Sequence, residues 1–212
     1  NKLLTTIAYR INGKTTYAME GSIFIAGAGV QWLRDRMNFF KNAAETEKIV
    51  KKLKDNNGIY LVPAFTGLGA PHWNANSRGV LSGITRDTSP NEIVRATIEA
   101  VAYQTYDLFE AMKHDGLRPN MVKVDGGMVM NNWFSQFLSD VVNVKVLRPK
   151  VQETTAVGAA FMAGLKIGVY KSLKDISKNW HLDKKFSPKM KNNNRSKLIK
   201  GWSKAVNRAL IN

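Results

Sequence analysis

The segment 121–132, MVKVDGGMVMNN, constrains the fold of this chain more than any other stretch. A β-branched run with Val122 and Val124 ends in an acid, two glycines follow, and an amphipathic segment begins at Trp133. This order predicts a strand, a tight glycine turn and the start of a helix. Glycine lets the backbone approach a ligand closely, and a helix start offers free N–H groups to an anion. The segment is therefore a candidate nucleotide-contacting turn, although an ordinary turn between a strand and a helix has the same pattern.

Hydrophobic periodicity predicts alternating strands and helices along the rest of the chain. The expected strands are 3–10, 15–19, 59–63, 79–84, 121–124 and 144–147. The expected helices begin near 22, 46, 89, 132, 154, 172 and 196. Asn12-Gly13 predicts a two-residue hairpin turn, and Ser89-Pro90-Asn91-Glu92 predicts a capping box with proline at the first helical position. Strands followed by helices imply an α/β domain with a mixed sheet covered by helices on both faces.

Composition excludes several classes of site and leaves one alternative function open. The chain has no cysteine, which rules out disulfides, cysteine-ligated zinc and thiol catalysis. It has neither an apolar run near 18 residues nor a secretory signal pattern, and we expect a cytoplasmic protein. A net charge of +16 attracts phosphates or nucleic acid. A genomic base composition that favours Lys and Asn codons would produce the same basic surface without any such function. Because residue 1 is Asn and a strand-like run follows at once, we suspect a fragment of a longer protein.

Seven stretches together resemble the FGGY carbohydrate kinase family, and within it the glycerol kinases. The segment 79–99, GVLSGITRDTSPNEIVRATIE, fits the second signature of the family position for position. The other stretches are LLTTIA (3–8), YAMEGSIFIAGAGVQWLRD (17–35), VPAFTGLGAPHW (62–73), ATIEAVAYQT (96–105), VDGGMVMNN (124–132) and ETTAVGAAFMAGL (153–165). The resemblance extends from residue 1 to about residue 208 and is weakest over 183–198.

The resemblance implies an actin-like, RNase H-like ATPase fold. It implies that 1–172 form the C-terminal nucleotide-binding domain of such a kinase, and we expect 173–212 to form a helical extension packed on it. Glycerol kinases transfer the γ-phosphoryl of ATP to glycerol, giving sn-glycerol 3-phosphate, with Mg²⁺. The catalytic base of the family is an Asp in a Gly-Asp-Gln motif, which this sequence lacks. We therefore expect no catalytic residue and no metal ligand in this chain, and no kinase activity from it alone.

Four residues match nucleotide-binding positions of the family: Gly27, Gln31, Gly127 and Asn131. Without the resemblance, helix packing would explain Gly27 and exposure on a helix would explain Gln31. Glycine at 127 allows close approach to the adenosine, and the Asn131 amide can donate and accept hydrogen bonds. Asp125 could serve as a metal ligand or a base, but an acid that caps the glycine turn is the simpler interpretation.

The expected partners follow from the same resemblance. They are ATP or ADP, glycerol, a missing N-terminal domain and further copies of the enzyme in a dimer or tetramer, without nucleic acid or membrane. Two alternatives remain: a sister FGGY kinase for another polyol or sugar, and a basic module that binds polyanions. The LLTTIA and FTGLGAPHW stretches argue against the first, and aromatics at core spacing argue against the second.

Overall fold

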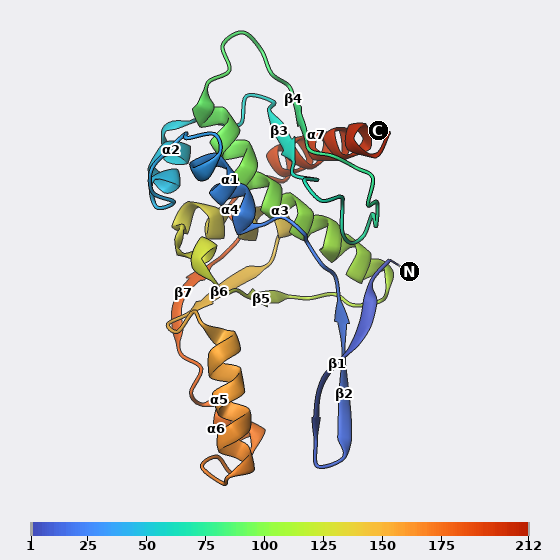
Figure 1. Ribbon diagram of the computed structural model, residues 1–212, viewed down its shortest axis with the longest axis vertical. Coiled ribbons are helices and arrows are strands. Elements are labelled where there is room, and N and C mark those ends of the chain that lie inside the picture. Colours follow the sequence, from blue (N-terminus) through green and yellow to red (C-terminus); the bar gives the residue numbers. More distant parts are fainter. Residues whose placement is uncertain (1, 212) are drawn as a thin grey trace.

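The computed structural model describes residues 2–211 as helices, short strands and ordered loops (Figure 1). The strands are β1 (Leu4–Ile11), β2 (Lys14–Glu20), β3 (Tyr60–Val62), β4 (Val80–Ser82), β5 (Met121–Lys123), β6 (Lys145–Pro149) and β7 (Leu182–Phe186). The helices are α1 (Gly27–Asp35), α2 (Glu45–Lys52), α3 (Pro90–His114), α4 (Asn132–Val142), α5 (Thr154–Lys166), α6 (Leu173–Ser177) and α7 (Asn192–Leu210), with a 3-10 turn η1 (Gly127–Met130). Within these residues, no helix combines the length and apolar character needed to cross a bilayer.

The α/β class is as expected, but the strands form three small sheets instead of one. β1 pairs with β2, β3 with β4, and β6 lies between β5 and β7. The three-stranded sheet is mixed, because β5 and β6 run parallel and β7 runs antiparallel to β6. The β3–β4 pair contacts both α3 and α7, while α4 packs against β6 and β7. The sequence predicts strand positions well, but which strands become neighbours depends on long-range pairing that a local pattern does not contain.

Helix α3 is the centre of the fold. It contacts α1, α2, α4 and β3, and it crosses the middle of the molecule (Figure 1). From Val94 to Tyr103 every residue is buried, whereas the sequence predicts a single apolar stripe. Small side chains at Ala96, Ala100 and Ala102 let neighbouring elements approach this helix from several sides. A helix that is buried all round belongs to the interior of a domain.

Two buried charged side chains of α3, Arg95 and Glu99, form an ion pair. Arg95 Nε donates to Glu99 Oε1 at 2.7 Å, and the Tyr103 hydroxyl donates to Glu99 Oε2 at 2.9 Å. Burial raises the pKa of Glu99, although Arg95 and Tyr103 oppose the shift. Arg95 Nη1 also donates to the carbonyl of Leu53 at 2.7 Å, and its guanidinium lies over the ring of Trp133 in α4. The pair therefore ties the end of α2 and the start of α4 to α3.

The predicted hairpin is confirmed, while the first helix starts later than expected. Asn12 and Gly13 have φ of 50° and 78°, which a two-residue hairpin turn of this kind requires. Helix α1 begins at Gly27 and not near Ser22. The Ser22 carbonyl accepts a hydrogen bond from the Ala70 N–H at 3.0 Å, so a tertiary contact with the long loop 64–78 holds this segment out of the helix.

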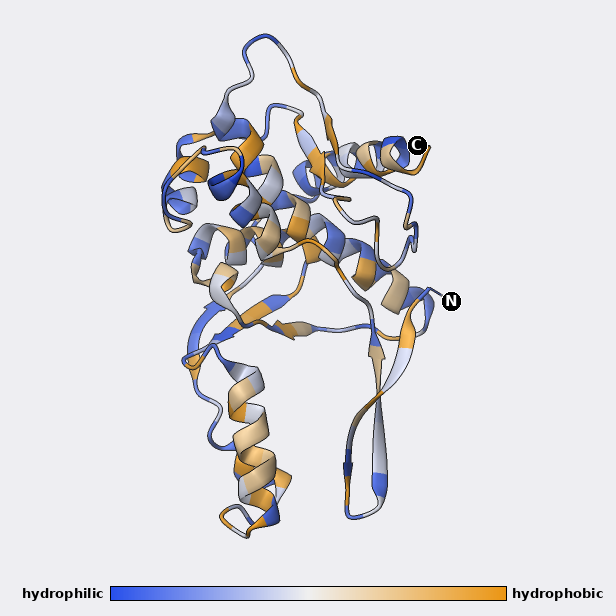
Figure 2. Ribbon diagram, viewed as in Figure 1, coloured by the Kyte–Doolittle hydropathy of each residue, from blue (hydrophilic) through white to orange (hydrophobic). Residues whose placement is uncertain are grey.

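Two arms project from the core (Figure 1). The β1–β2 hairpin forms one arm, and α5 with α6 forms the other. Both carry exposed apolar side chains, with Ile7 60%, Tyr17 67% and Ile167 78% exposed. Figure 2 shows apolar residues along most of α5, where only Gly164 is buried. Exposed apolar surface of this extent marks an interaction surface.

The segment 173–212 contains a strand as well as helices. β7 pairs antiparallel with β6, so this segment contributes to the three-stranded sheet. Helix α7 packs against β3 and β4 and buries Trp202, whose ring stacks on Tyr103. The sequence does not predict β7, because the segment Leu182-Asp183-Lys184-Lys185-Phe186 is short and mostly charged. The division of the chain at 172 stays a prediction.

The capping box of α3 makes a stability prediction. The Ser89 hydroxyl accepts from the Asn91 N–H at 3.2 Å, and Glu92 Oε2 accepts from the Ser89 N–H at 3.0 Å. We expect Ser89→Ala to lower the free energy of unfolding by about 1 kcal/mol at pH 7, measured by urea denaturation. The control Ser203→Ala, at an exposed position of α7, should change it by less than about 0.5 kcal/mol.

This effect should depend on pH. The Ser89 hydroxyl donates to Glu92 Oε2 at 2.5 Å and lowers the pKa of Glu92 below its ordinary value of 4.5, because this hydrogen bond favours the ionised carboxylate. A lowered pKa in the folded state stabilises the fold above pH 4.5, and this stabilisation is lost as the pH falls through the lower folded value. The difference between wild type and Ser89→Ala should therefore shrink below that pH. An undiminished difference in strong acid would contradict this assignment.

Candidate functional site

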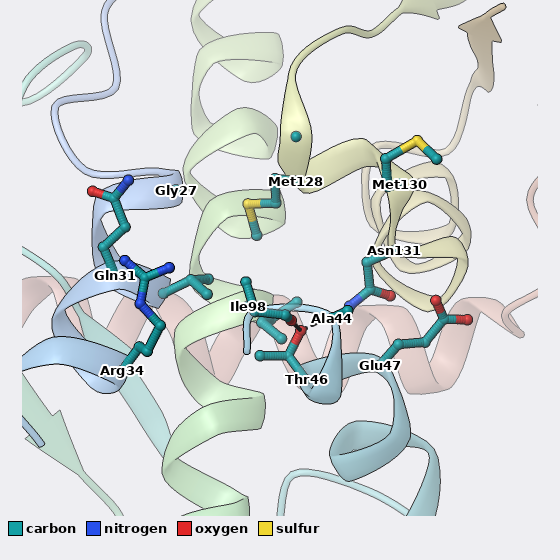
Figure 3. Close-up of a pocket in the computed structure, with 13 residues that line it drawn as sticks. Gly27, Gln31, Arg34, Ala44, Thr46, Glu47, Ile98, Met128, Met130 and Asn131 are labelled. Atoms are coloured by element: carbon teal, nitrogen blue, oxygen red, sulfur yellow. Dashed lines mark hydrogen bonds between the residues drawn. The ribbon is translucent and has the colours of Figure 1, made fainter. Parts of the chain in front are cut away.

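The four expected site residues lie around one cavity of about 410 Å³. Helix α1 supplies one side, η1 and the start of α4 supply another, and α2 and α3 complete it. Figure 3 shows Gln31 and Arg34 on one side, facing Met130, Asn131 and Glu47 on the other. The lining residues are Gly27, Val30, Gln31, Arg34, Ala43, Ala44, Thr46, Glu47, Ile98, Gly127, Met128, Met130 and Asn131. Segments almost a hundred residues apart in the chain thus form a single site.

One face of α1 lines the cavity. Gly27, Gln31 and Arg34 are separated by four and three residues, a spacing that puts side chains on the same side of a helix. A Cβ atom on Gly27 would meet no protein atom within 4 Å, whereas one on Gly29 would lie 3.0 Å from Thr97 Cγ2. Helix packing therefore explains Gly29 and not Gly27. The missing side chain of Gly27 leaves the cavity open.

The two glycines of the turn after β5 have different reasons to be glycine. Gly126 has a φ of 83°, a backbone conformation that side chains with a Cβ rarely adopt. Gly127 begins the 3-10 turn η1 with ordinary φ, and a Cβ there would meet no protein atom within 4 Å. The turn needs Gly126 for its backbone, and Gly127 keeps space free beside the cavity.

Asn131 is the N-cap of α4 as well as a lining residue. Its Oδ1 accepts a hydrogen bond from the Phe134 N–H at 3.0 Å. Its Nδ2 donates to Thr46 Oγ1 at 3.4 Å. An amide nitrogen has two N–H groups, so one donor remains for a ligand. Helix α4 begins at Asn132, as the sequence predicts, and the 3-10 turn η1 precedes Asn131.

The carboxylate of Glu47 lies at the N-terminal end of α4. Glu47 Oε2 accepts from the Asn132 N–H at 3.3 Å, and Glu47 Oε1 lies 2.6 Å from Lys51 Nζ. Partial burial opposes ionisation, but the contacts with Lys51 and Asn132 outweigh it and lower the pKa of Glu47. The sequence analysis expected this helix end to face a bound anion. The Glu47 carboxylate takes part of that place, where the helix dipole stabilises it.

Helix α2 is the part of the site that the sequence analysis missed. Ala43, Ala44, Thr46 and Glu47 all line the cavity, and none was singled out. A local signal existed: the Ala44 N–H donates to Asn42 Oδ1, and the Asn42 N–H donates to Glu45 Oε1. Asn followed three residues later by Glu is a helix-start pattern, and α2 begins at Glu45, at the end of this pattern. It does not reveal that this end of α2 faces α4.

The other candidates lie away from the cavity. Asp125 accepts a hydrogen bond from the hydroxyl of Thr154 at the start of α5, which agrees with an acid that stabilises the turn. His72 belongs to the long loop, and its Nε2 lies 3.5 Å from Oδ2 of Asp107 in α3. Among residues 2–211, no group of three or more His, Asp or Glu side chains could hold a metal ion.

Two further cavities lie in the part of the chain that the structure describes. One of about 570 Å³ lies between the start of β3, α3, α4 and α7, and charged and amide side chains such as Lys54, Asp140 and Lys197 line it. Another of about 490 Å³ lies beside His72 and Asp107. The cavity at Gly127 has mostly apolar walls and a few convergent polar groups, which is the usual character of a small-molecule site.

Comparison with known proteins identifies the family. Residues 3–167 match the model of the C-terminal domain of the FGGY family of carbohydrate kinases. The chain belongs to this family. It is 54% identical over 208 residues to glycerol kinase 1 of Pseudomonas aeruginosa and 55% identical over 209 residues to glycerol kinase of Alcanivorax borkumensis. In each case the match covers 98% of this chain and 42% of the relative.

Solved structures support the same FGGY fold. The chain superposes on Plasmodium falciparum glycerol kinase with ADP at a TM-score of 0.88 and 38% identity, covering 99% of this chain and 42% of that one. A gluconate kinase from Lactobacillus acidophilus matches at a TM-score of 0.78 and 22% identity, covering 97% and 41%, which shows the fold alone. The actin-like ATPase fold expected from the sequence is confirmed. The chain spans about two fifths of the length of its relatives.

The two glycines of the turn offer a test of the site in this FGGY kinase chain. We expect Gly127→Ala to leave the fold intact and to weaken adenine-nucleotide binding roughly tenfold, because the added methyl group narrows the cavity. Gly126→Ala should instead lower the free energy of unfolding by about 1–3 kcal/mol, because its φ of 83° and ψ of 171° lie in a region that is populated almost only by glycine. Calorimetric titration with ADP and thermal unfolding separate the two effects. Equal nucleotide affinity in wild type and Gly127→Ala would contradict the site.

Proposed function

We propose that this chain is the nucleotide-binding part of a glycerol kinase, which transfers the γ-phosphoryl group of ATP to glycerol to give sn-glycerol 3-phosphate. The observation that carries the proposal is the convergence of Gly27, Gln31, Gly127 and Asn131 on one cavity. These residues come from two distant segments and match nucleotide-binding positions of the family. The glycerol kinases above 50% identity support glycerol as the acceptor.

The cavity suits an adenosine group. Val30, Ala44, Ile98 and Met128 give it apolar walls that a purine ring can contact. Gln31 and the remaining N–H of Asn131 can hydrogen-bond to the edge of a base or to ribose. Because Gly27 and Gly127 have no side chain, both walls leave room for the ligand to approach the backbone. The chain thus binds and orients the nucleotide.

The groups that complete the reaction lie outside this chain. Phosphoryl transfer needs the phosphates held in line, their charge neutralised by a metal ion, and the acceptor hydroxyl oriented by a base. Glu47 is the one carboxylate on the described cavity wall, and Lys51 and Asn132 already engage it. We infer that Mg²⁺ binds with the ATP phosphates and that these residues do not hold it. The base and the glycerol-binding groups belong to the rest of the enzyme.

The apolar arms are the surface that the rest of the enzyme covers in this proposal. The relatives are more than twice as long as this chain, so chain is available to cover them. β5 is an edge strand, and α5 and the β1–β2 hairpin expose apolar side chains (Figure 2). An N-terminal domain that pairs and packs here would bury these groups. We further propose that the complete enzyme is a dimer or tetramer in the cytoplasm, where ATP is available.

Protection of the two arms tests this arrangement. We expect the amide hydrogens of 4–20 and 154–166 to exchange at least tenfold more slowly in a complete kinase than in the 212-residue chain, because burial suppresses local opening. The complete kinase can be assembled by joining this chain to the amino-terminal part of a glycerol kinase relative. Amides of 94–103 in α3 provide the control, because they are buried in either case. Unchanged exchange in both arms would contradict the proposed interface.

The reaction itself gives the decisive test. We expect the assembled kinase to convert ATP and glycerol to ADP and glycerol 3-phosphate in a coupled assay. The 212-residue chain alone should give no measurable turnover, because its sequence contains no Gly-Asp-Gln motif. Gluconate and xylulose in place of glycerol test the sister-kinase alternative. Turnover by the chain alone, or a preference for another polyol or sugar, would overturn the corresponding part of the proposal.

One structural feature keeps the polyanion alternative testable. Lys197, Lys200, Lys204 and Arg208 are exposed at helical spacing along α7. A polyanion-binding module would bind unrelated DNA and heparin with an affinity that falls steeply as salt rises. ADP binding in the cavity should survive Lys200→Gln and Lys204→Gln, because both residues lie on α7, away from the cavity.

A further inference from the structure

Helix α2 holds the start of α4 through two side chains, Thr46 and Glu47, which we call the α2 latch. Thr46 is 4% exposed, and its hydroxyl donates to the Ala43 carbonyl at 2.6 Å. The single proton of that hydroxyl is therefore used within α2. Its oxygen can only accept from Asn131 Nδ2, which lies 3.4 Å away. Thr46 thus dictates that the nitrogen side of the Asn131 amide points toward α2 (Figure 3).

The other side of the Asn131 amide is fixed as well. Its Oδ1 accepts from the Phe134 N–H at 3.0 Å, as the N-cap of α4. A rotation of the amide by half a turn would bring its NH₂ group against the Phe134 N–H and its oxygen against Thr46. The two contacts therefore permit one orientation only. In that orientation the second N–H of the amide remains available at the cavity.

Glu47 supports the same end of α4 through the backbone. It accepts from the Asn132 N–H at 3.3 Å, next to the residue that Thr46 holds. Its negative charge faces Lys51 at 2.6 Å and the positive end of α4, so it adds little repulsion toward a nucleotide phosphate. The two contacts join segments 85 residues apart in the chain, and α2 itself is anchored by Val50, which is fully buried.

From these contacts we propose that Thr46 and Glu47 are positioning residues of the nucleotide site, which hold the Asn131 amide in its ligand-binding orientation before the nucleotide arrives. The inference rests on the proposed function, because it concerns the same cavity. Hydrogen-bonding groups that are already ordered strengthen binding, because less conformational entropy is lost when the ligand binds. Neither residue needs to touch the nucleotide for this effect. A purely structural contact would affect the stability of the fold and leave nucleotide binding unchanged.

The decisive variant is Thr46→Val in the assembled kinase. Valine has nearly the shape of threonine but no hydroxyl, so Asn131 Nδ2 loses its partner. We expect the KM for ATP and the Kd for ADP to rise about three- to tenfold, because the half-buried Asn131 amide loses a hydrogen bond and gains alternative orientations. kcat and the KM for glycerol should change by less than about twofold, since the latch acts on the nucleotide alone. Thr46→Ser restores the hydroxyl and should restore the affinity.

Two further variants show through which residue the latch acts. Asn131→Ser keeps an N-cap for α4 but is too short to reach Thr46, and it should weaken ADP binding by itself. If Thr46 acts through Asn131, then Thr46→Val should have no further effect on ADP binding in the Asn131→Ser protein. Glu47→Ala should raise the Kd for ADP without changing the KM for glycerol. The matched control is Thr105→Val, which removes a hydroxyl that bonds within α3 at the Val101 carbonyl, 2.8 Å away.

The outcomes separate this inference from the proposed function. Wild-type enzyme that phosphorylates glycerol, together with Thr46→Val enzyme of equal affinity for ADP, overturns the latch and leaves the function standing. Additive effects of Thr46→Val and Asn131→Ser also overturn it. If Thr46→Val fails to fold, Glu47→Ala carries the same comparison, and wild-type affinity in Glu47→Ala decides against the latch. Wild-type enzyme without affinity for ADP overturns the proposed function and the latch with it.

Discussion

The fold depends on the burial of α3 together with its internal ion pair. Arg95 and Glu99 lie on successive turns of this helix, and each would be costly to bury without the other. Because the Arg95 guanidinium also bonds to the Leu53 carbonyl and lies over Trp133, it fixes the end of α2 and the start of α4 against the same helix. These contacts therefore hold α2 and α4, two of the elements that line the cavity, in place against α3.

The cavity exists because three short segments end close together on α3. Helix α1 brings one glycine-containing face, the turn after β5 brings Gly127, and α2 brings Thr46 and Glu47. Asn131 shows how closely fold and function are combined here, since one amide caps α4, contacts α2 and offers a donor to the cavity. The glycines have two kinds of role. Gly29 allows close packing against Thr97, and Gly126 allows a positive φ. Gly27 and Gly127 leave space open at the cavity.

Local signals predicted most elements of this chain, and the failures have physical causes. The Asn12-Gly13 turn and the Ser89…Glu92 capping box depend on neighbouring residues, and both are present as predicted. The start of α1, the strand β7 and the division into three sheets depend on contacts between distant segments. The four proposed nucleotide residues came from family resemblance, and the structure brings them to one cavity. The sequence could not show that α2 lines the cavity, because a helix-start pattern does not indicate which other element faces that end of the helix.

The sequence alone determined most helices and turns, the family, and the four residues proposed to bind a nucleotide, because each depends on local backbone preference or on a linear motif. Only the tertiary structure decided which glycine leaves space and which one serves packing, since that depends on atoms far along the chain. It also decided the orientation of the Asn131 amide, which Thr46 and Phe134 set from two sides. Side-chain orientation is a property of the neighbours that surround a residue, and those neighbours meet only when the chain has folded.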